Sequence, residues 1–153
     1  MNDIEPVVEF ASWGRSWAVG APLIVLTVVV HVLGLGLIRS MFHQAFRQRR
    51  RLIHGDVAHF ALVMSVTVSL VTVLHVLQAT LWAAAFLLTG AMPTAHRAML
   101  YSISAMTTYG HATLYLDPHW QMLGALEALN GAIMLGLSTA FLYAMIQQAW
   151  PGK

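Results

Sequence analysis

A broken, partly polar segment between two long apolar ones holds the residues best suited to chemistry in this chain. It runs from Ala98 to Trp120 and contains Thr-Thr-Tyr-Gly-His-Ala-Thr at 107–113. The part from Ala98 to Thr107 has neither Gly nor Pro and carries small and apolar residues at helical spacing, which predicts a short helix.

The run after this short helix has a non-helical character and would leave backbone carbonyls without partners in lipid. Such backbone is tolerated at membrane depth only where protein buries it or where it lines a water-filled path. Carbonyl oxygens in such a path can replace the hydration shell of a cation. We therefore predict that 94–118 forms a reentrant pore loop that enters and leaves the membrane on one side.

The composition indicates a membrane protein. Of the 153 residues, 58% are hydrophobic and 9% are charged, and the mean hydropathy is +0.68. Soluble domains carry about 25% charged residues. The length suits three membrane spans and the loop. Because the chain has no Cys, disulfides, thiolate metal sites and a Cys nucleophile are excluded.

The first predicted span is 18–38, which has no charged residue and is long enough to cross a bilayer. Residues 1–17 lack the pattern of a secretory signal. We expect them to be an extracytoplasmic lead, because the basic connection described next is placed in the cytoplasm. Pro22 is expected in the first turns of the helix, where a missing N–H costs least. His31 is expected to bond to a neighbouring helix, with a cofactor ligand as the alternative.

The connection at 39–56 is basic. It holds five of the eight Lys and Arg residues, which are Arg39, Arg47, Arg49, Arg50 and Arg51. The positive-inside rule places it in the cytoplasm, which puts the N-terminus outside and the C-terminus inside. Topology alone explains this cluster, and contact of Arg47–Arg51 with anionic lipid is the alternative. We expect no nucleic-acid binding.

The second predicted span, 57–88, is 32 residues long. At 1.5 Å per residue it would reach roughly 48 Å, so it must tilt, bend or project beyond a core of about 30 Å. His75 and Gln78 lie one turn apart and share a face. This spacing predicts an interhelical hydrogen-bond site, with proton sensing by His75 as a further possibility.

The last predicted span is 120–148, after a turn at Asp117-Pro118. Asp117 is expected to cap the helix, or alternatively to supply negative field at the pore mouth. Glu127 is a functional candidate because an acid inside a membrane is expensive. It either faces the ion path or supports the pore helix from behind, and we expect the second.

Three further residues of the last span are candidates for support or movement. Asn130 could belong to the same network as Glu127. Gly131 and Gly136 permit either close helix packing, which is the commoner use, or a gating bend. A side of the helix with Glu127, Gly131, Met134 and Ser138 at helical spacing is also apparent.

The run 107–113 resembles, in register and without a gap, the Thr-Thr-x-Gly-Tyr-Gly-Asp selectivity filter of pore-loop potassium channels, specifically small bacterial ion channel proteins with two transmembrane helices and a pore. The likeness continues through 120–131 and 136–141, which look like the inner helix of the family. A looser likeness in the preceding helix is carried by His75, Gln78 and Trp82.

This resemblance implies an all-α membrane protein with three transmembrane helices, a reentrant pore helix and a filter loop in a tetrameric pore. The pore domain would be 57–153, with outer helix 57–88, pore loop 94–118 and inner helix 120–148, and the first span would lie outside it. A homotetramer is implied because one loop supplies only a quarter of a coordinating ring. The segment expected to line or support the filter comprises Thr107, Thr108, Tyr109, Gly110, His111, Ala112 and Thr113.

The chain departs from the family pattern at the end of the filter. His111, Ala112 and Thr113 stand where the family has Tyr, Gly and an acid. A residue with Cβ costs roughly 1–2 kcal/mol where the backbone needs a positive φ. Loss of the acid removes a ring of negative charge. We therefore expect a filter that is less selective for K⁺ than the family pattern.

The predicted function is passive transport of monovalent cations, K⁺ or weakly selective, across a bacterial plasma membrane. We expect no enzymatic activity, since no nucleotide-binding or nucleophile motif occurs, and no cofactor beyond the permeant ions. A non-conducting membrane interaction protein on a channel fold is one alternative. Because the chain has eight His, a haem- or metal-binding membrane protein is the other.

Overall fold

The structure is a computed structural model that describes residues 4–49, 57–110 and 114–149, and side chains within 13–44, 57–110 and 114–148. All regular secondary structure in these ranges is helical. The elements are α1 (Ile4–Arg49), α2 (Val57–Leu88), α3 (Ala95–Met106), the 3₁₀ helix η1 (Pro118–Trp120) and α4 (Gln121–Ala149).

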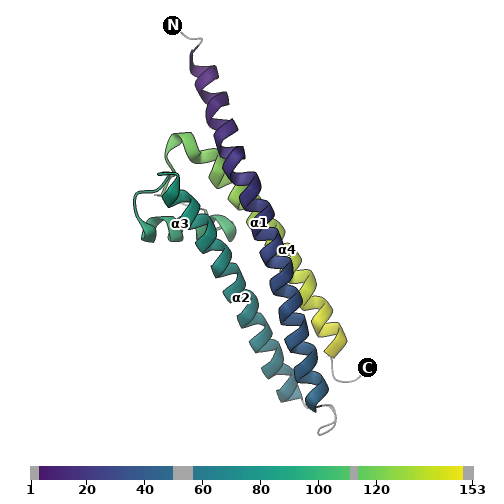
Figure 1. Cartoon of the computed structure of the whole chain (residues 1–153). Helices are drawn as coiled ribbons and strands as arrows, with labels where there is room; N and C mark the ends of the chain where they lie inside the picture. The colour runs from purple at the N-terminus through teal and green to yellow at the C-terminus, as the bar shows by residue number, and fades with distance from the viewer. Residues whose placement is uncertain (1–3, 50–56, 111–113, 150–153) are drawn as a thin grey trace.

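Three helices are long and apolar enough to cross a membrane, at Trp13–Gln44, Val57–Leu88 and Pro118–Gln148. They form a bundle, with the short α3 folded back beside α2 near one end (Figure 1). The prediction of an all-α, multi-pass membrane protein with three spans is therefore confirmed.

α1 is much longer than the first span predicted at 18–38. It has 46 residues and takes in most of the predicted lead 1–17 and the first part of the predicted connection 39–56. The helix continues beyond both ends of the predicted span because the Glu, Gln and Arg residues on either side of the apolar stretch are good helix formers. The end of the hydrophobic pattern therefore marks the edge of the span and not the end of the helix.

Pro22 lies inside α1 and not in its first turns as expected, because the helix begins at Ile4. Proline has no N–H, so α1 lacks the backbone hydrogen bond that this position would donate to the carbonyl of Ala18. Membrane helices tolerate such a gap, since local adjustment and neighbouring helices can satisfy the freed carbonyl.

The other long helices agree closely with the sequence pattern. α2 begins and ends at the predicted residues, and α4 begins one residue after the predicted start at Trp120. Asp117 caps η1, the turn that leads into α4, because its side chain accepts a 3.0 Å hydrogen bond from the N–H of His119.

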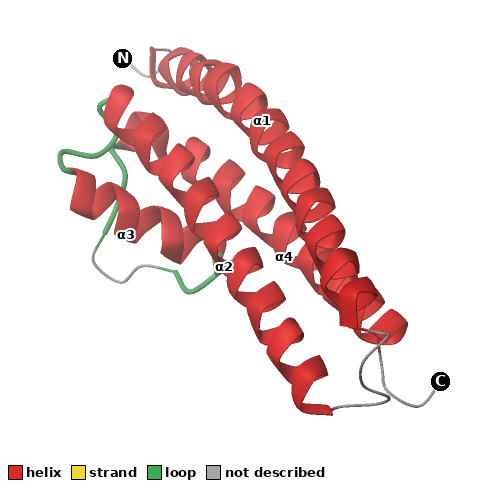
Figure 2. Ribbon diagram, turned by 60° about the horizontal axis from the view of Figure 1, so that its bottom comes forward, coloured by secondary structure: helices red, strands yellow, loops and turns green. Residues whose placement is uncertain are grey.

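The loop before α3 and the segment just before η1 meet at one end of the bundle (Figure 2). They are joined there by a hydrogen bond of 3.2 Å from the N–H of Asp117 to the carbonyl of Ala91. The opposite end of the bundle carries the last turns of α1 and α4 and the first turn of α2. This bond holds the chain before η1 against the loop before α3.

The apolar core consists of three clusters arranged along the bundle. The cluster nearest the loops includes Trp82, Phe86, Ala98, Leu123 and Leu126. The middle cluster contains Leu35, Ile38, Val71 and Leu74, and the cluster at the far end contains Phe42, Met64 and Met145. Polar side chains from α1, α2 and α4 meet between the first and second clusters, and these are described below.

Candidate functional site

α3 is a 12-residue helix whose buried face packs on α2 and α4. The sequence predicted it at Ala98–Thr107, so it begins three residues earlier than expected. Thr94 caps its first turn, with the Thr94 hydroxyl accepting from the N–H of Arg97 at 3.4 Å. Its buried residues are Ala98, Ser102, Ser104, Ala105 and Met106.

The end of α3 lies against the middle of α4. A Cβ built on Gly131 would be 2.5 Å from the Cα of Met106 and 2.7 Å from the Met106 carbonyl oxygen, so only glycine fits at this contact. Gly131 is the eleventh residue of α4 and lies roughly 15 Å along the axis from Gln121. That distance is about half of a hydrocarbon core of ~30 Å.

A tight turn ends α3. Thr108 has a φ of 57°, in the left-handed region. The N–H of Thr108 donates to the carbonyl of Ala105 at 3.2 Å, and the N–H of Tyr109 donates to the carbonyl of Ser104 at 3.0 Å. This pair of bonds is a Schellman motif, in which glycine is the usual left-handed residue. Threonine at this position stores roughly 1 kcal/mol of backbone strain.

The described part of the predicted filter is exposed on the chain. Thr107, Thr108 and Gly110 are exposed, and Tyr109 is 86% exposed. Gly110 also has a positive φ, of 74°. The three remaining filter candidates, His111, Ala112 and Thr113, lie outside the described residues. The turn after α3 therefore presents polar groups and backbone away from the core of its own chain.

Glu127 is fully buried and lies behind α3. Ser102 of α3 is hydrogen-bonded to the Glu127 carboxyl, and the Ser102 Oγ also lies 2.7 Å from the carbonyl oxygen of Ala79 in α2. These contacts join α2, α3 and α4 at a single hydroxyl. The position corresponds to the expected support of the short helix from behind.

The proton count of this contact indicates the state of Glu127. A serine hydroxyl donates only one proton, but the Ser102 Oγ lies within hydrogen-bonding distance of two acceptors. If Ser102 donates its proton to the Ala79 carbonyl oxygen, its contact with Glu127 is a hydrogen bond only when the carboxyl donates to the Ser102 Oγ. The second carboxyl oxygen of Glu127 has no partner among the described residues, and an ionised carboxylate in that state would be costly in a membrane. A protonated Glu127 satisfies both constraints.

Asn130 makes its contact elsewhere. It is fully buried, and its Nδ2 donates to the Oγ1 of Thr27 in α1 at 2.9 Å. We expected Asn130 to share the network of Glu127 and to support the filter. Its hydrogen bond instead joins α4 to α1. Its position three residues after Glu127 turns it toward a different neighbour.

Five polar residues from all three long helices form what we term the histidine layer, comprising Thr27, His31, His75, Gln78 and Ser138. Gln78 Nε2 lies 3.3 Å from the carbonyl oxygen of Thr27 and 2.8 Å from His31 Nδ1. Ser138 Oγ lies 3.1 Å from His31 Nε2 and 3.0 Å from His75 Nε2. The two imidazole centroids are 5.2 Å apart. His75 and Gln78 thus both bond to other helices.

The two glycines of α4 differ in surroundings. Gly131 contacts the backbone of Met106, as described above, whereas a Cβ on Gly136 would meet nothing within 4 Å. α4 is continuous through both residues. Gly131 therefore serves close packing in this conformation, and Gly136 faces open space.

Thr27 and Ser102 were missed by the sequence reasoning. Thr27 could have been found, because Thr27, His31 and Gly34 lie at helical spacing in an otherwise apolar span and mark its buried face. Gly34 confirms this face, since a Cβ there would lie 2.8 Å from the side chain of Leu74. Ser102 carries no comparable signal, because short helices often contain serine.

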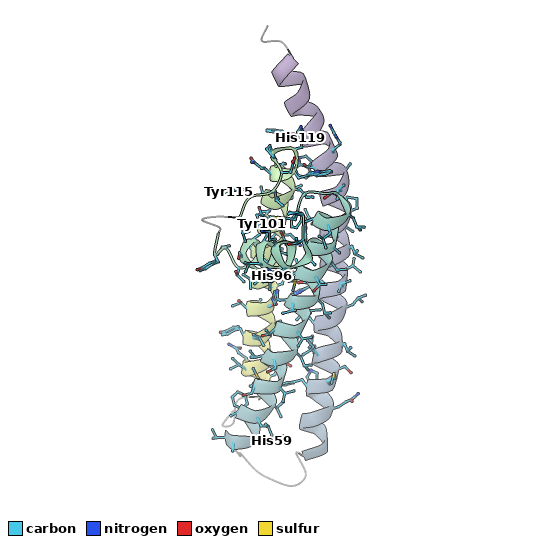
Figure 3. All side chains as sticks on the ribbon, turned by 90° about the vertical axis from the view of Figure 1, so that its left-hand side faces the viewer. His59, His96, Tyr101, Tyr115 and His119 are labelled. Atoms are coloured by element: carbon cyan, nitrogen blue, oxygen red, sulfur yellow. The ribbon has the colours of Figure 1, made fainter. Side chains whose placement is uncertain are left out.

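The titratable side chains at the loop end are mostly on the surface. Figure 3 shows His96, Tyr101, Tyr115 and His119 in the part of the molecule that contains α3, and His59 at the opposite end. The N–H and ring of His119 hold the pKa of Asp117 below its ordinary value. Within the described residues, no group of three or more His, Cys, Asp or Glu side chains could hold a metal ion.

No protein-family model matches this chain, and no curated protein or solved structure matches it.

Proposed function

We propose that this chain is one subunit of a homotetrameric pore-loop channel that passes monovalent cations, K⁺ or several cations with weak selectivity. The segment 107–113 would line the ion path, and α3 would be its reentrant pore helix. The first span, in α1, would lie outside the pore domain 57–153. The membrane would be a bacterial plasma membrane, with the basic connection on the cytoplasmic side.

The observation that carries this proposal is the position of the C-terminal end of α3. It lies against Gly131 in the middle of the apolar helix α4, and an exposed turn follows it at 107–110. In a chain with three membrane-spanning helices, an exposed polar turn at that level needs a partner other than lipid. Copies of the same turn around a water-filled axis would provide one.

The direction of α3 supports cation transport over anion transport. The C-terminal end of a helix carries partial negative charge from its last carbonyl groups. That end precedes the proposed ion path, so the short helix would favour a cation there. Glu127 is bonded behind α3, whereas Asp117 is an exposed acid just before η1 and would add negative field at the mouth of the path.

Ion flux into liposomes tests the proposal directly. Purified protein in vesicles with separate K⁺, Na⁺ and H⁺ gradients should give flux of at least one of the monovalent metal cations. Ala112→Gly should change the flux or the K⁺ to Na⁺ ratio, because it restores the small residue of the filter pattern. Ala132→Gly, at an exposed position of α4, is the matched control and should leave the ratio unchanged.

Absence of flux from well-folded protein would reject the channel proposal. Native mass spectrometry gives an independent measurement, since the proposal requires four copies. A folded tetramer that passes no ion would favour the non-conducting interaction protein, for which the departures at His111, Ala112 and Thr113 are the specific sequence observation. A folded monomer would reject the pore in any form.

A further inference from the structure

The histidine layer has a donor and acceptor order that depends on protonation. We infer that it is a proton-sensitive latch, which holds α1 against α2 and α4 while His31 and His75 are both neutral and loosens when either is protonated. The latch concerns the packing of the first span, so it does not depend on the proposed ion conduction.

The order begins at the Gln78 amide. Its Nε2 lies 3.3 Å from the carbonyl oxygen of Thr27, and a carbonyl oxygen only accepts hydrogen bonds. The opposite amide orientation would place the Gln78 Oε1 against another acceptor. The Thr27 carbonyl therefore fixes the nitrogen at this position, and the same nitrogen donates to His31 Nδ1 at 2.8 Å.

The protons of both imidazoles follow from this orientation. His31 accepts at Nδ1, so in its neutral form it carries its proton on Nε2 and donates to the Ser138 Oγ at 3.1 Å. The Ser138 hydroxyl can then donate its own proton to His75 Nε2 at 3.0 Å. In the order that we infer, it does so, and His75 carries its proton on Nδ1. Each contact in this chain has one donor and one acceptor.

Protonation breaks the chain at a defined contact. A proton on His31 Nδ1 would face the N–H donors of Gln78. A proton on His75 Nε2 would make the Ser138 hydroxyl turn its own proton away and accept from both rings. The imidazolium would also be poorly solvated, since His31 is fully buried and an unpaired buried charge is costly. Two imidazolium rings at a centroid distance of 5.2 Å would repel each other as well.

The surrounding helices offer no acid in direct contact. His31 is the only titratable residue of α1 between Arg15 and Arg39, and α2 carries only His59 and His75. α4 carries Glu127, which is bonded to Ser102, and Tyr143, which is exposed. The titratable residues of α3 are His96, Arg97 and Tyr101. The positive charge would therefore lack a counterion within the layer.

Loosening of α1 is the expected result because the layer holds hydrogen bonds to α1 from both α2 and α4. The hydrogen bonds of Gln78 and Ser138 to α1 both belong to the layer, and Asn130 bonds to Thr27 just beside it. Apolar contacts remain elsewhere, for example where Gly20 packs against Leu123 and Leu126. Acid should therefore weaken the docking of α1 without unfolding the bundle.

Nitrogen NMR of the full chain, labelled with ¹⁵N in histidine and held in lipid nanodiscs, tests the proton order. At pH 8 we expect the N–H proton of His31 on Nε2 and that of His75 on Nδ1, assigned with the single His31→Gln and His75→Gln variants. Protonation of either ring as the pH falls from 8 should coincide with loss of this order. The reverse tautomers at pH 8, or an order that persists after either ring is protonated, would overturn the inference.

Thermal melting gives the second measurement. The melting midpoint of the wild type should fall by at least about 2 °C between pH 8 and pH 5. This is the shift expected when the histidine layer loses part of its hydrogen bonding in a chain of this size. The double variant His31→Gln/His75→Gln should lose this fall, and His96→Gln, at an exposed position, should keep it. If the melting midpoint of the double variant still falls between pH 8 and pH 5, the latch is overturned. If the double variant does not fold, the tautomers of the wild type, measured by NMR, decide whether the latch exists. Neither measurement depends on ion flux, so the channel proposal can fail while the latch stands.

Discussion

Gly131 and Met106 approach so closely that a Cβ on Gly131 would lie 2.5 Å from the Cα of Met106. The atoms in the way belong to the backbone of α3, which cannot turn aside as a side chain can. The contact therefore fixes the end of the short helix, and the turn that follows it, relative to the long helix α4.

Gly131→Ala should displace the end of α3. We expect it to lower the free energy of unfolding by about 1–3 kcal/mol, the usual effect of overpacking a close contact. Gly136→Ala is the matched control, because a Cβ there meets nothing within 4 Å and alanine is the better helix former. Thermal melts of both variants in one detergent decide the matter, and equal effects would contradict the close packing.

Thr108→Gly should stabilise the chain. The left-handed φ of 57° at Thr108 strains a residue with Cβ, so glycine should add roughly 1 kcal/mol to the free energy of unfolding. Thr107→Gly is the control, since Thr107 has a φ of −92° and gains no such relief. A loss of stability in Thr108→Gly would show that the turn has another conformation in the assembled protein.

Glu127→Gln should be tolerated better than Glu127→Ala. If the carboxyl is protonated, an amide N–H can replace its donor role toward Ser102, and we expect a change of less than about 1 kcal/mol. Alanine leaves a cavity and removes the partner of Ser102, which should cost about 2–4 kcal/mol. An infrared band of a protonated carboxyl that disappears in Glu127→Gln would show that Glu127 is protonated. Equal destabilisation by Glu127→Gln and Glu127→Ala would indicate that Glu127 is ionised.

The cap at Asp117 should give the chain a specific acid sensitivity. The backbone N–H of His119, followed by its ring, lowers the pKa of Asp117 from its ordinary value of 3.8. The carboxylate therefore stabilises the turn above pH 3.8, and this contribution is lost as the pH falls through the lower folded value. Asp117→Ala should melt earlier than the wild type at pH 6, and the difference should shrink at pH 2.5. If the difference in melting midpoint were the same at pH 6 and pH 2.5, it would come from packing of the Asp117 side chain and not from its charge.

External acid should reduce conductance if His111 faces the ion path. Protonation of four copies would place up to four positive charges in that path. Flux into liposomes should therefore fall from pH 8 to pH 5, and His111→Gln should abolish the fall. Because the histidine layer responds over the same range, the double variant His31→Gln/His75→Gln serves as the control and should still lose flux in acid. Equal flux at both pH values would contradict the prediction.

Hydrophobicity predicted the three spans, and the apolar stretch 57–88 also predicted where α2 begins and ends. Gly90 and Pro93 follow soon after Leu88 and mark the end of this helix. It did not predict the length of α1, because polar helix formers continue the helix beyond the membrane. Length and periodicity thus identify spans better than they identify helix ends.

The site was only partly predictable for a similar reason. Glu127 was an evident candidate, because a single acid in an apolar span must have a partner. That its partner is Ser102, and that Asn130 instead bonds to Thr27, depends on the axial register and rotation of packed helices. Spacing within one helix contains neither quantity.

Pro22 gives α1 a point of low bending stiffness. The missing backbone bond to Ala18 lies toward the N-terminus from Thr27 and His31, which fasten the rest of the helix to its neighbours. The first turns of α1 extend past the loop end of the bundle (Figure 1), whereas Gly20, two residues before Pro22, packs against Leu123 and Leu126. A bend at Pro22 would therefore change how this packed turn lies on α4.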